Sequence, residues 1–185
     1  MKRVLLGLGS NRNFNGKSSL ELLVYACHDL SSFITEIKFS SVYKTKAMYV
    51  ENQNDFYNMA VSGFVPDETD PYTFLEQIHK IEAEYGRDRE KEIRFGPRSI
   101  DIDIELFGDS FINDEILQIP HIRMEERAFV LIPALEILTD SADELMREKY
   151  SNCLAKLQKE GGADGIEKIQ DYSEVVENGT IRKHN

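Results

Sequence analysis

The sequence predicts an α+β fold of the ferredoxin-like type, an α/β sandwich in which helices pack on a mainly antiparallel sheet. Candidate segments follow the order strand, helix, strand, strand, helix, strand. Apolar residues recur at helical spacing in two of these segments and alternate with polar residues in another. This split order is typical of a fold in which both helices return the chain to one sheet.

The length of the chain favours a single domain. Its 185 residues, of which 41% are hydrophobic, are enough for one full core and few for two. We assign residues 1–169 to the domain and residues 170–185 to a C-terminal tail, because the chain is mostly polar beyond Asp171. Asn178-Gly179 fits either a hairpin turn or a loose tail.

The first half of the chain supplies three strands and one helix. Residues 4–8 are almost continuously apolar and predict a buried strand, and residues 18–30 place apolar side chains at helical spacing. Two further extended segments are expected over residues 37–45 and 56–64.

The remaining elements carry helix start and stop signals. Pro71 suits the first turn of a second helix, which Gly86 ends. Residues 126–138 predict a third helix that Pro133 either kinks or breaks. Residues 141–144 read as a capping box that opens a last helix, which the glycine pair at 161–162 ends.

Two carboxylates stand on one side of the strand predicted over residues 100–105. Isoleucines alternate with polar residues there, so Asp101 and Asp103 point the same way. At a rise of about 3.3 Å per residue their Cα atoms lie roughly 6.5 Å apart. Magnesium takes one or two protein carboxylates and completes its shell with water and phosphate oxygens. The segment predicts a metal and polyphosphate site; the alternative is an ordinary amphipathic strand, against which the poor strand propensity of aspartate weighs.

A cationic tract precedes this strand in an otherwise acidic chain. The formal net charge of −11 argues against non-specific binding to nucleic acid or to an anionic membrane. Residues 87–98 nevertheless contain Arg87, Arg89, Lys91, Arg94 and Arg98. The tract could be a solvated loop of mixed charge, but beside the aspartates it is better read as the receptor for the anion that the metal bridges.

The two cysteines and the apolar segments place the protein in the cytoplasm. Cys27 and Cys153 are far apart in sequence and fit neither a disulfide framework nor a zinc site. No signal-like run opens the chain, and no segment approaches the length of a membrane span. We expect a cytoplasmic monomer.

Small polar and aromatic residues suggest a pocket for a flat heterocycle, which needs hydrogen bonds at its edge and apolar groups at its faces. Thr45 and Asn58 lie in segments that should pair as neighbouring strands, and Phe56 stands beside them. Phe129 could cover the second face. Taken singly, a phenylalanine in such a position is more often plain core.

A glycine-rich segment and a lone histidine are less specific. Residues 7–11 lack the third glycine of a dinucleotide fingerprint, because Arg12 holds its position, so a strand that ends in a glycine turn is the simpler reading. His121 stands near Arg123 and Arg127, and either a ligand-binding or a structural role remains open for it.

Taken together, these residues resemble the 6-hydroxymethyl-7,8-dihydropterin pyrophosphokinase family of folate biosynthesis. The likeness spans residues 2–138 and is carried by the segments 7–11, 41–45, 55–58, 96–103, 120–121 and 127–129. It implies a kinase-type transferase that moves pyrophosphate from ATP to the hydroxymethyl group of the pterin and releases AMP. It also implies two Mg²⁺ ions.

The resemblance assigns roles to individual residues. The catalytic set is Arg87, Arg98, Asp101 and Asp103, and the two aspartates hold the metal ions. The pterin-binding set is Thr45, Ala47, Met48, Phe56, Asn58 and Phe129. The ATP-binding set is Glu82, Arg89, Arg94, Arg98, Ile104, His121 and Arg127.

Two other functions fit parts of the pattern. A catalytically silent pterin or nucleotide binding module would keep the pocket, although the intact Asp101 and Asp103 argue against it. An RNA-binding domain of ferredoxin-like fold needs a basic sheet face with exposed aromatic residues, which the acidic charge balance disfavours.

Overall fold

The computed structural model, which describes residues 1–46, 53–89 and 96–178, is a mixed fold of helices and antiparallel sheet. The main sheet has the strand order β5-β1-β4-β3-β8, and β2 also pairs with β4. Every pairing in it is antiparallel. The strands are β1 (Lys2–Ser10), β2 (Thr35–Phe39), β3 (Val42–Thr45), β4 (Phe56–Val65), β5 (Asp101–Phe107) and β8 (Glu167–Gln170).

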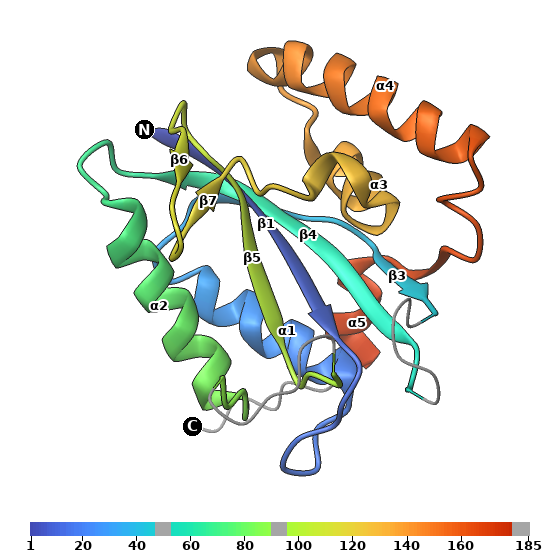
Figure 1. Cartoon of the computed structure of the whole chain (residues 1–185). Helices are drawn as coiled ribbons and strands as arrows, with labels where there is room; N and C mark the ends of the chain where they lie inside the picture. The colour runs from blue at the N-terminus through green and yellow to red at the C-terminus, as the bar shows by residue number, and fades with distance from the viewer. Residues whose placement is uncertain (47–52, 90–95, 179–185) are drawn as a thin grey trace.

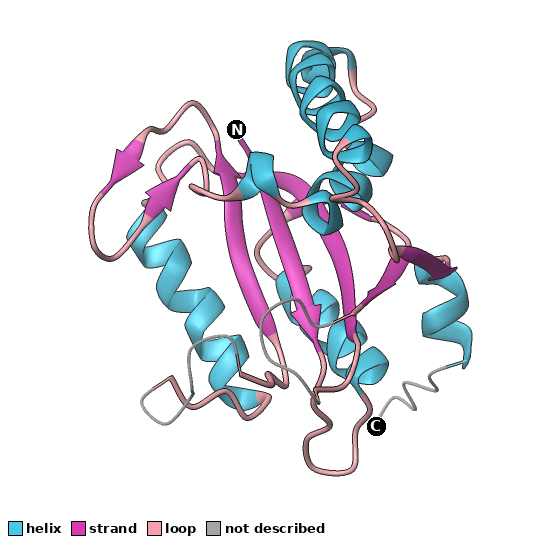
Figure 2. Cartoon of the chain, turned by 45° about the vertical axis from the view of Figure 1, so that its right-hand side comes forward, coloured by secondary structure: helices cyan, strands magenta, loops and turns pink. Residues whose placement is uncertain are grey.

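Helices cover both faces of this sheet (Figures 1 and 2). One face carries α1 (Ser19–Leu30), α2 (Pro71–Glu84) and α5 (Tyr172–Asn178), and the other carries α3 (Ala128–Ile137) and α4 (Glu144–Lys159). Two clusters of buried apolar side chains lie between these layers. Short elements complete the fold: the hairpin strands β6 (Ile112–Asn113) and β7 (Gln118–Ile119), and the 3-10 turns η1 (Met124–Glu126) and η2 (Ser141–Asp143).

The helices on the first face begin where their capping residues place them. Ser18 and Glu21 form a reciprocal capping box at the start of α1. At the start of α2, Asp70 accepts a hydrogen bond from the Thr73 amide, and Pro71 occupies the first turn. The second-helix start predicted at Pro71 is confirmed.

The central strand β1 pairs with β4 on one side and with β5 on the other. Leu5 pairs with Leu106 while Leu6 pairs with Ile104, so β5 has one more residue than β1 at this point. That residue is Glu105, the extra residue of a β-bulge. Bulges bend a strand and re-aim its side chains, and this one lies beside the candidate site described below.

The single extended segment predicted over residues 37–45 is wrong in one respect, because it is two strands separated at Ser40 and Ser41. Ser40 explains the break. Its amide donates to the Ala60 carbonyl, but the Ala60 amide donates to the Ser40 hydroxyl instead of to a main-chain carbonyl. The side chain thus replaces one bond of the strand ladder.

Two helix predictions on the second face can be compared with the structure. Of the two effects expected of Pro133, a kink or a break, the break is wrong, because α3 runs through this residue with Val130, Leu131 and Ala134 buried against the sheet. The capping box is formed by Asp140 and Asp143, one residue earlier than predicted. An ion pair of 2.6 Å from Arg3 to the Asp143 carboxylate holds that turn.

The segment predicted as a tail from residue 170 is structured as far as it is described. Gln170 ends β8 and pairs with Val42, and Tyr172 stacks on Phe39 with ring centroids 4.2 Å apart. Val175 of α5 is only 3% exposed. Residues 179–185, including the glycine of the Asn178-Gly179 pair, lie outside the described residues.

Both cysteines are free thiols, as the sequence predicts. Cys27 is fully buried in the core under α1, and burial raises the pKa of its thiol. Among the described helices, none is long and apolar enough to cross a membrane.

If α5 is part of the domain, shortening its buried side chain will destabilise the whole fold. Val175→Ala should lower the free energy of unfolding by about 2 kcal/mol, because it removes two buried methyl groups and leaves a small cavity. Ser173→Ala, on the exposed side of the same helix, is the matched control. Equal unfolding midpoints for the two variants in urea would show that the segment does not contribute to the core.

Candidate active site

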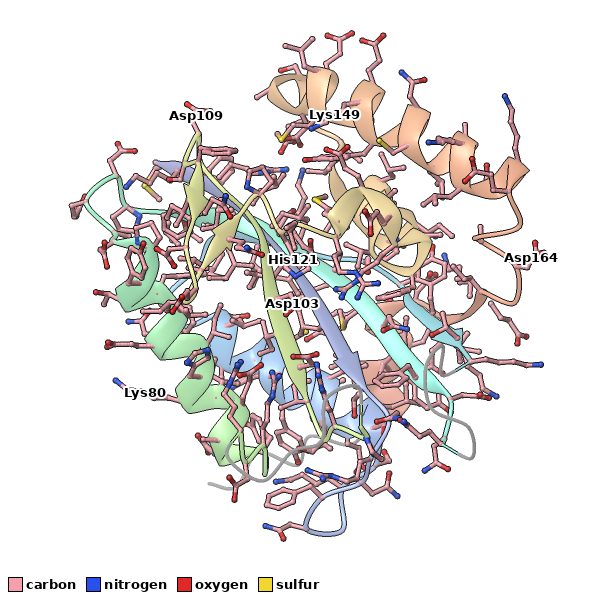
Figure 3. All side chains as sticks on the ribbon, in the orientation of Figure 1. Lys80, Asp103, Asp109, His121, Lys149 and Asp164 are labelled. Carbon is pink, nitrogen blue, oxygen red and sulfur yellow. The ribbon has the colours of Figure 1, made fainter. Side chains whose placement is uncertain are left out.

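A pocket of about 220 Å³ lies on the sheet face that carries α3. We call it the main pocket. It brings together most of the residues singled out in the sequence, although they come from five separate stretches of chain. Those in its lining are Thr45, Phe56, Asn58, Arg98, Asp101, Asp103, His121, Arg127 and Phe129. Figure 3 shows Asp103 and His121 close to each other over the middle of the sheet.

Two glycines of β1 form the floor of the main pocket. Gly9 pairs with Asp101 on one side and Asn58 on the other, and Gly7 pairs with Asp103 in the same way. A Cβ atom on Gly9 would lie 3.3 Å from Asn58 Oδ1, and one on Gly7 would lie 2.9 Å from Glu105 Oε1. The absence of side chains at Gly7 and Gly9 therefore leaves an open strip of pocket floor, which we call the lane, between the aspartates of β5 and the residues of β4.

The β3–β4 side of the pocket offers an edge with hydrogen-bonding groups. Asn58 Nδ2 donates to Thr45 Oγ1 over 2.9 Å, and both residues are buried. This bond fixes the amide so that Asn58 Oδ1 faces the lane above Gly9. Phe56 and Phe129 line the same pocket from β4 and α3. The predicted residues Ala47 and Met48 lie outside the described residues.

Asp101 is the most strongly paired residue of the site. Both Arg87 and Arg98 form ion pairs with its carboxylate. Burial acts to raise the pKa of Asp101, but the two guanidinium groups outweigh it and hold the pKa below the usual carboxyl range. Asp101 therefore has two guanidinium partners, of which Arg87 is also paired with Glu82.

Asp103 has a different electrostatic environment, although it is two residues away on the same strand. Arg127 Nη1 lies 3.4 Å from its carboxylate. Burial and the neighbouring charge of Asp101 raise the pKa of Asp103 above the usual carboxyl range. A divalent cation between the two aspartates would remove this repulsion.

Glu82 anchors the arginines from behind. Its side chain is 1% exposed, and it accepts hydrogen bonds from the Ile102 amide at 2.8 Å and from Arg89 Nη2 at 2.5 Å. Arg87 also pairs with it. The structure therefore places Glu82 outside the lining of the described pockets, where it holds two cationic side chains. Arg94 lies outside the described residues.

His121 lies just after β7 and forms part of the wall between two pockets. Its amide donates to the Glu105 carbonyl over 3.0 Å, and its Nδ1 accepts from the Arg123 amide at 3.3 Å. Burial and the nearby Arg127 lower the pKa of His121 to about 4. The imidazole is therefore neutral at physiological pH.

A second pocket, of about 340 Å³, lies on the other side of His121. Of the predicted residues it contains Arg89, Asp103, Ile104 and His121. Asp103 and His121 belong to both pockets, so molecules bound in the two compartments would meet at these side chains. The arrangement suits a reaction between two bound molecules.

Several residues of the two pockets were not predicted from the sequence. Segment 114–118 of the β6–β7 hairpin lines the second pocket, and nothing in its short pattern indicated this. His79 also lines it, from α2, and the family resemblance places this position in the nucleotide region. Glu105 lines the main pocket, and the continued alternation after Asp101 and Asp103 was a signal that could have identified it.

The acidic groups of the main pocket fit a hard cation that is shared with a ligand. No group of three or more His, Cys, Asp or Glu side chains in the described ranges is placed to hold a metal ion without other ligands. Asp101 and Asp103 supply two carboxylates, and both carboxyl oxygens of the adjacent Glu105 lack a hydrogen-bond partner there. Magnesium favours such a partial protein shell, completed by water and phosphate.

Comparison with known proteins identifies one family. The family model of 7,8-dihydro-6-hydroxymethylpterin-pyrophosphokinase (HPPK) matches residues 5–139. The 2-amino-4-hydroxy-6-hydroxymethyldihydropteridine pyrophosphokinase of Aquifex aeolicus is 38% identical over 140 residues, which cover 74% of this chain and 81% of the relative. The Bacillus subtilis protein of the same name is 41% identical over 132 residues, covering 71% and 75%.

Larger proteins also contain a region like this chain. The folate synthesis bifunctional protein of Arabidopsis thaliana is 36% identical over an alignment of 186 positions, gaps included, which covers 98% of this chain and 36% of the relative. A crystal structure of Plasmodium falciparum HPPK-DHPS with pteroate superposes with a TM-score of 0.61 at 16% identity, over 91% of this chain and 48% of that chain. The chain thus spans about half the length of this solved structure, and the likeness supports the fold.

The anchoring role of Glu82 can be tested by removing its charge. Glu82→Gln keeps an acceptor for the Ile102 amide but leaves Arg87 and Arg89 without their shared carboxylate. We expect the free energy of unfolding to fall by about 3 kcal/mol, because the variant breaks a buried ion pair. Glu84→Gln, on the exposed side of α2, is the control. Surface substitutions typically change the free energy of unfolding by about 0.5 kcal/mol or less. A loss of that size for Glu82→Gln would refute the anchoring role of Glu82.

Proposed function

Since the chain belongs to the 7,8-dihydro-6-hydroxymethylpterin-pyrophosphokinase family, we propose that its reaction takes place where its two pockets meet. The enzymes of this family transfer pyrophosphate from ATP to 6-hydroxymethyl-7,8-dihydropterin in folate biosynthesis. The observation that carries this proposal is that Asp103 and His121 line both pockets. The main pocket would take the pterin and the second pocket the nucleotide.

The reaction requires the substrates to be aligned and their charges neutralised. The pterin hydroxymethyl oxygen attacks the β-phosphorus of ATP and releases its proton to water, the bond from that phosphorus to the α,β-bridging oxygen breaks, and AMP leaves. Phosphoryl-type transfer depends on positioning and electrostatics more than on covalent help from the protein. No protein nucleophile is required by this scheme.

The charged residues of the site fit this requirement. Asp101 and Asp103 would hold two Mg²⁺ ions, which when bound neutralise phosphate charge. Arg98, which contacts Asp101 and lines the main pocket, could pair with phosphate oxygens as well. Arg87 is 7% exposed and lines neither pocket, so its catalytic role would act through Asp101, with which it is paired. Arg89 and Arg127 add positive charge on either side of Asp103. Ile104 would supply an apolar contact for the nucleotide, and Arg94 and His121 would bind its phosphates.

The neutral side of the main pocket fits the pterin. Asn58 and Thr45, held together by their hydrogen bond, would read the edge of the ring system. Phe56 and Phe129 would stack on its two faces. Main-chain groups near Ala47 and Met48 are assigned to the same edge by family resemblance.

The proposal also covers the fold class, the cellular location and the partners of the protein. We assign the sheet to the ferredoxin-like class, which the order β5-β1-β4 with β2 and β3 beyond β4 supports. The cytoplasmic location and the monomeric state stay predictions from the sequence. The net charge of −11 supports the expectation that neither nucleic acid nor an anionic membrane is a partner.

Asp103 provides the direct test of the metal-dependent transfer. Asp103→Asn should lower the rate of AMP formation from ATP and the pterin about a thousand-fold or more, because it weakens charge stabilisation at the reacting phosphate. Its stability should change by only about 1 kcal/mol, since 38% of the Asp103 side chain is exposed.

The matched control for this variant is Asp109→Asn, just beyond the end of β5 on the surface (Figure 3). AMP should appear only when ATP, the pterin and Mg²⁺ are all present, and excess EDTA should abolish it. Pterin and nucleotide binding without any AMP formation would instead support a silent binding module.

Phe129 tests the assignment of the main pocket to the pterin. Phe129→Ala should raise the KM for the pterin about tenfold or more through lost stacking and apolar contact, and should leave the KM for ATP nearly unchanged. The control Phe111→Ala removes a phenylalanine that is 83% exposed. An equal rise in the KM for ATP would show that the two pockets are assigned to the wrong substrates.

A further inference from the structure

Glu105 is an unusual residue for the position that it occupies. Its side chain is 1% exposed, and within the described part of the chain neither carboxyl oxygen has a hydrogen-bond partner. It lines the main pocket beside Asp101 and Asp103. The transfer described above gives it no role.

The backbone aims this side chain at the pocket. Glu105 is the extra residue of the bulge in β5, where Leu5 pairs with Leu106 and Leu6 with Ile104. Its carboxyl group lies over Gly7, where a Cβ atom would come within 2.9 Å of Oε1. The bulge and the glycine together give a carboxyl group room on the pocket floor.

A buried carboxyl without a partner destabilises a fold. Asp143 shows the usual solution: it is equally buried, but its carboxylate pairs with Arg3 at 2.6 Å and accepts from the Asp140 amide at 3.2 Å. Glu82 is similarly satisfied by two arginines and an amide. The hydrogen-bonding capacity of Glu105 is therefore not used by any protein group among the described residues.

The neighbouring histidine does not account for the carboxyl group. His121 Nδ1 lies 3.7 Å from Glu105 Oε2, which is too long for a hydrogen bond, and Nδ1 already accepts from the Arg123 amide. His121 is positioned through its own amide, which donates to the Glu105 carbonyl. Any residue at position 105 would supply that carbonyl.

The neighbouring aspartates indicate which molecule fits. Magnesium held by one or two carboxylates keeps several water ligands, and each of these waters is a strong hydrogen-bond donor. Asp103 is two residues away on the same strand, so a metal at Asp101 and Asp103 would bring such waters towards the pocket floor. Outer acceptors of this kind orient metal ligands and strengthen binding.

We propose that Glu105 is a further acidic residue of the magnesium site, which accepts hydrogen bonds from metal-bound water and does not ligate the metal directly. The proposal rests on the assignment of Mg²⁺ to Asp101 and Asp103. It explains why a carboxyl group that costs the fold stability is present on the pocket floor. It also agrees with the lack of a three-carboxylate cluster among the described residues.

The test measures metal-dependent binding without turnover. The probe is α,β-methylene-ATP, which lacks the bridging oxygen that the transfer must release and is therefore unreactive. Its affinity is measured at increasing Mg²⁺ for the wild type, Glu105→Met, which has a similar volume, and Glu105→Gln. We expect Glu105→Met to need about tenfold more Mg²⁺ for half-maximal binding, and Glu105→Gln to lie between, because its amide oxygen can still accept.

The melting temperature in EDTA gives a second, independent readout. Glu105→Met should raise it by about 3 °C or more, since it removes an unsatisfied buried group. Asp143→Asn, the matched control, removes a satisfied carboxylate that lines neither pocket; it should lower the melting temperature and leave the Mg²⁺ requirement unchanged. A structural role for Glu105 would lower the melting temperature of Glu105→Met instead.

The other possible results of the binding measurements also decide the proposal. An unchanged Mg²⁺ requirement in Glu105→Met overturns the proposal, and so does a change confined to pterin affinity. If Asp103→Asn still raises the Mg²⁺ requirement in that case, the proposed transfer stands without Glu105. Nucleotide binding that is independent of Mg²⁺ in the wild type would overturn both.

Discussion

The ion pairs of Asp101 with Arg87 and Arg98 are the interaction on which the rest of the site depends. A carboxylate in a largely buried position would normally be disfavoured, and the two guanidinium groups reverse this. Arg87 is held in turn by Glu82, whose own carboxylate is fixed by the Ile102 amide in the strand that carries Asp101 and Asp103. The helix α2 and the strand β5 are thereby joined through charges beside the site proposed for the polyphosphate.

The sheet adds a second constraint, which is space. Gly7 and Gly9 separate the acidic strand β5 from the polar edge of β3 and β4, and each faces a side chain that a Cβ atom would crowd. The strand order places these glycines in the centre of the sheet, between the residues assigned to the metal and those assigned to the pterin. In the proposed arrangement, the glycines leave space between the pterin at Phe56 and the metal at Asp103.

Much of this could be predicted from the sequence, because the signals were local. The alternation around Asp101 and Asp103 fixes their common face, Pro71 marks a helix start, and the family motifs name nine residues that do line one pocket. The features that were missed depend on contacts between distant segments. The strand over residues 37–45 is divided because the Ser40 hydroxyl accepts a hydrogen bond from the Ala60 amide. The helix cap lies one residue earlier than predicted, where Asp143 forms an ion pair with Arg3. The helix α5 packs on the α1 side of the core.

The proposal that Asp101 and Asp103 hold the metal ions beside the two pockets can be tested by one direct measurement. A crystal structure with Mg²⁺, α,β-methylene-ATP and the pterin should show metal ions about 2.1 Å from carboxylate oxygens of both Asp101 and Asp103, each also bound to phosphate oxygens. Metal ions coordinated only by phosphate and water, with Asp101 still paired to Arg87 and Arg98, would contradict the account.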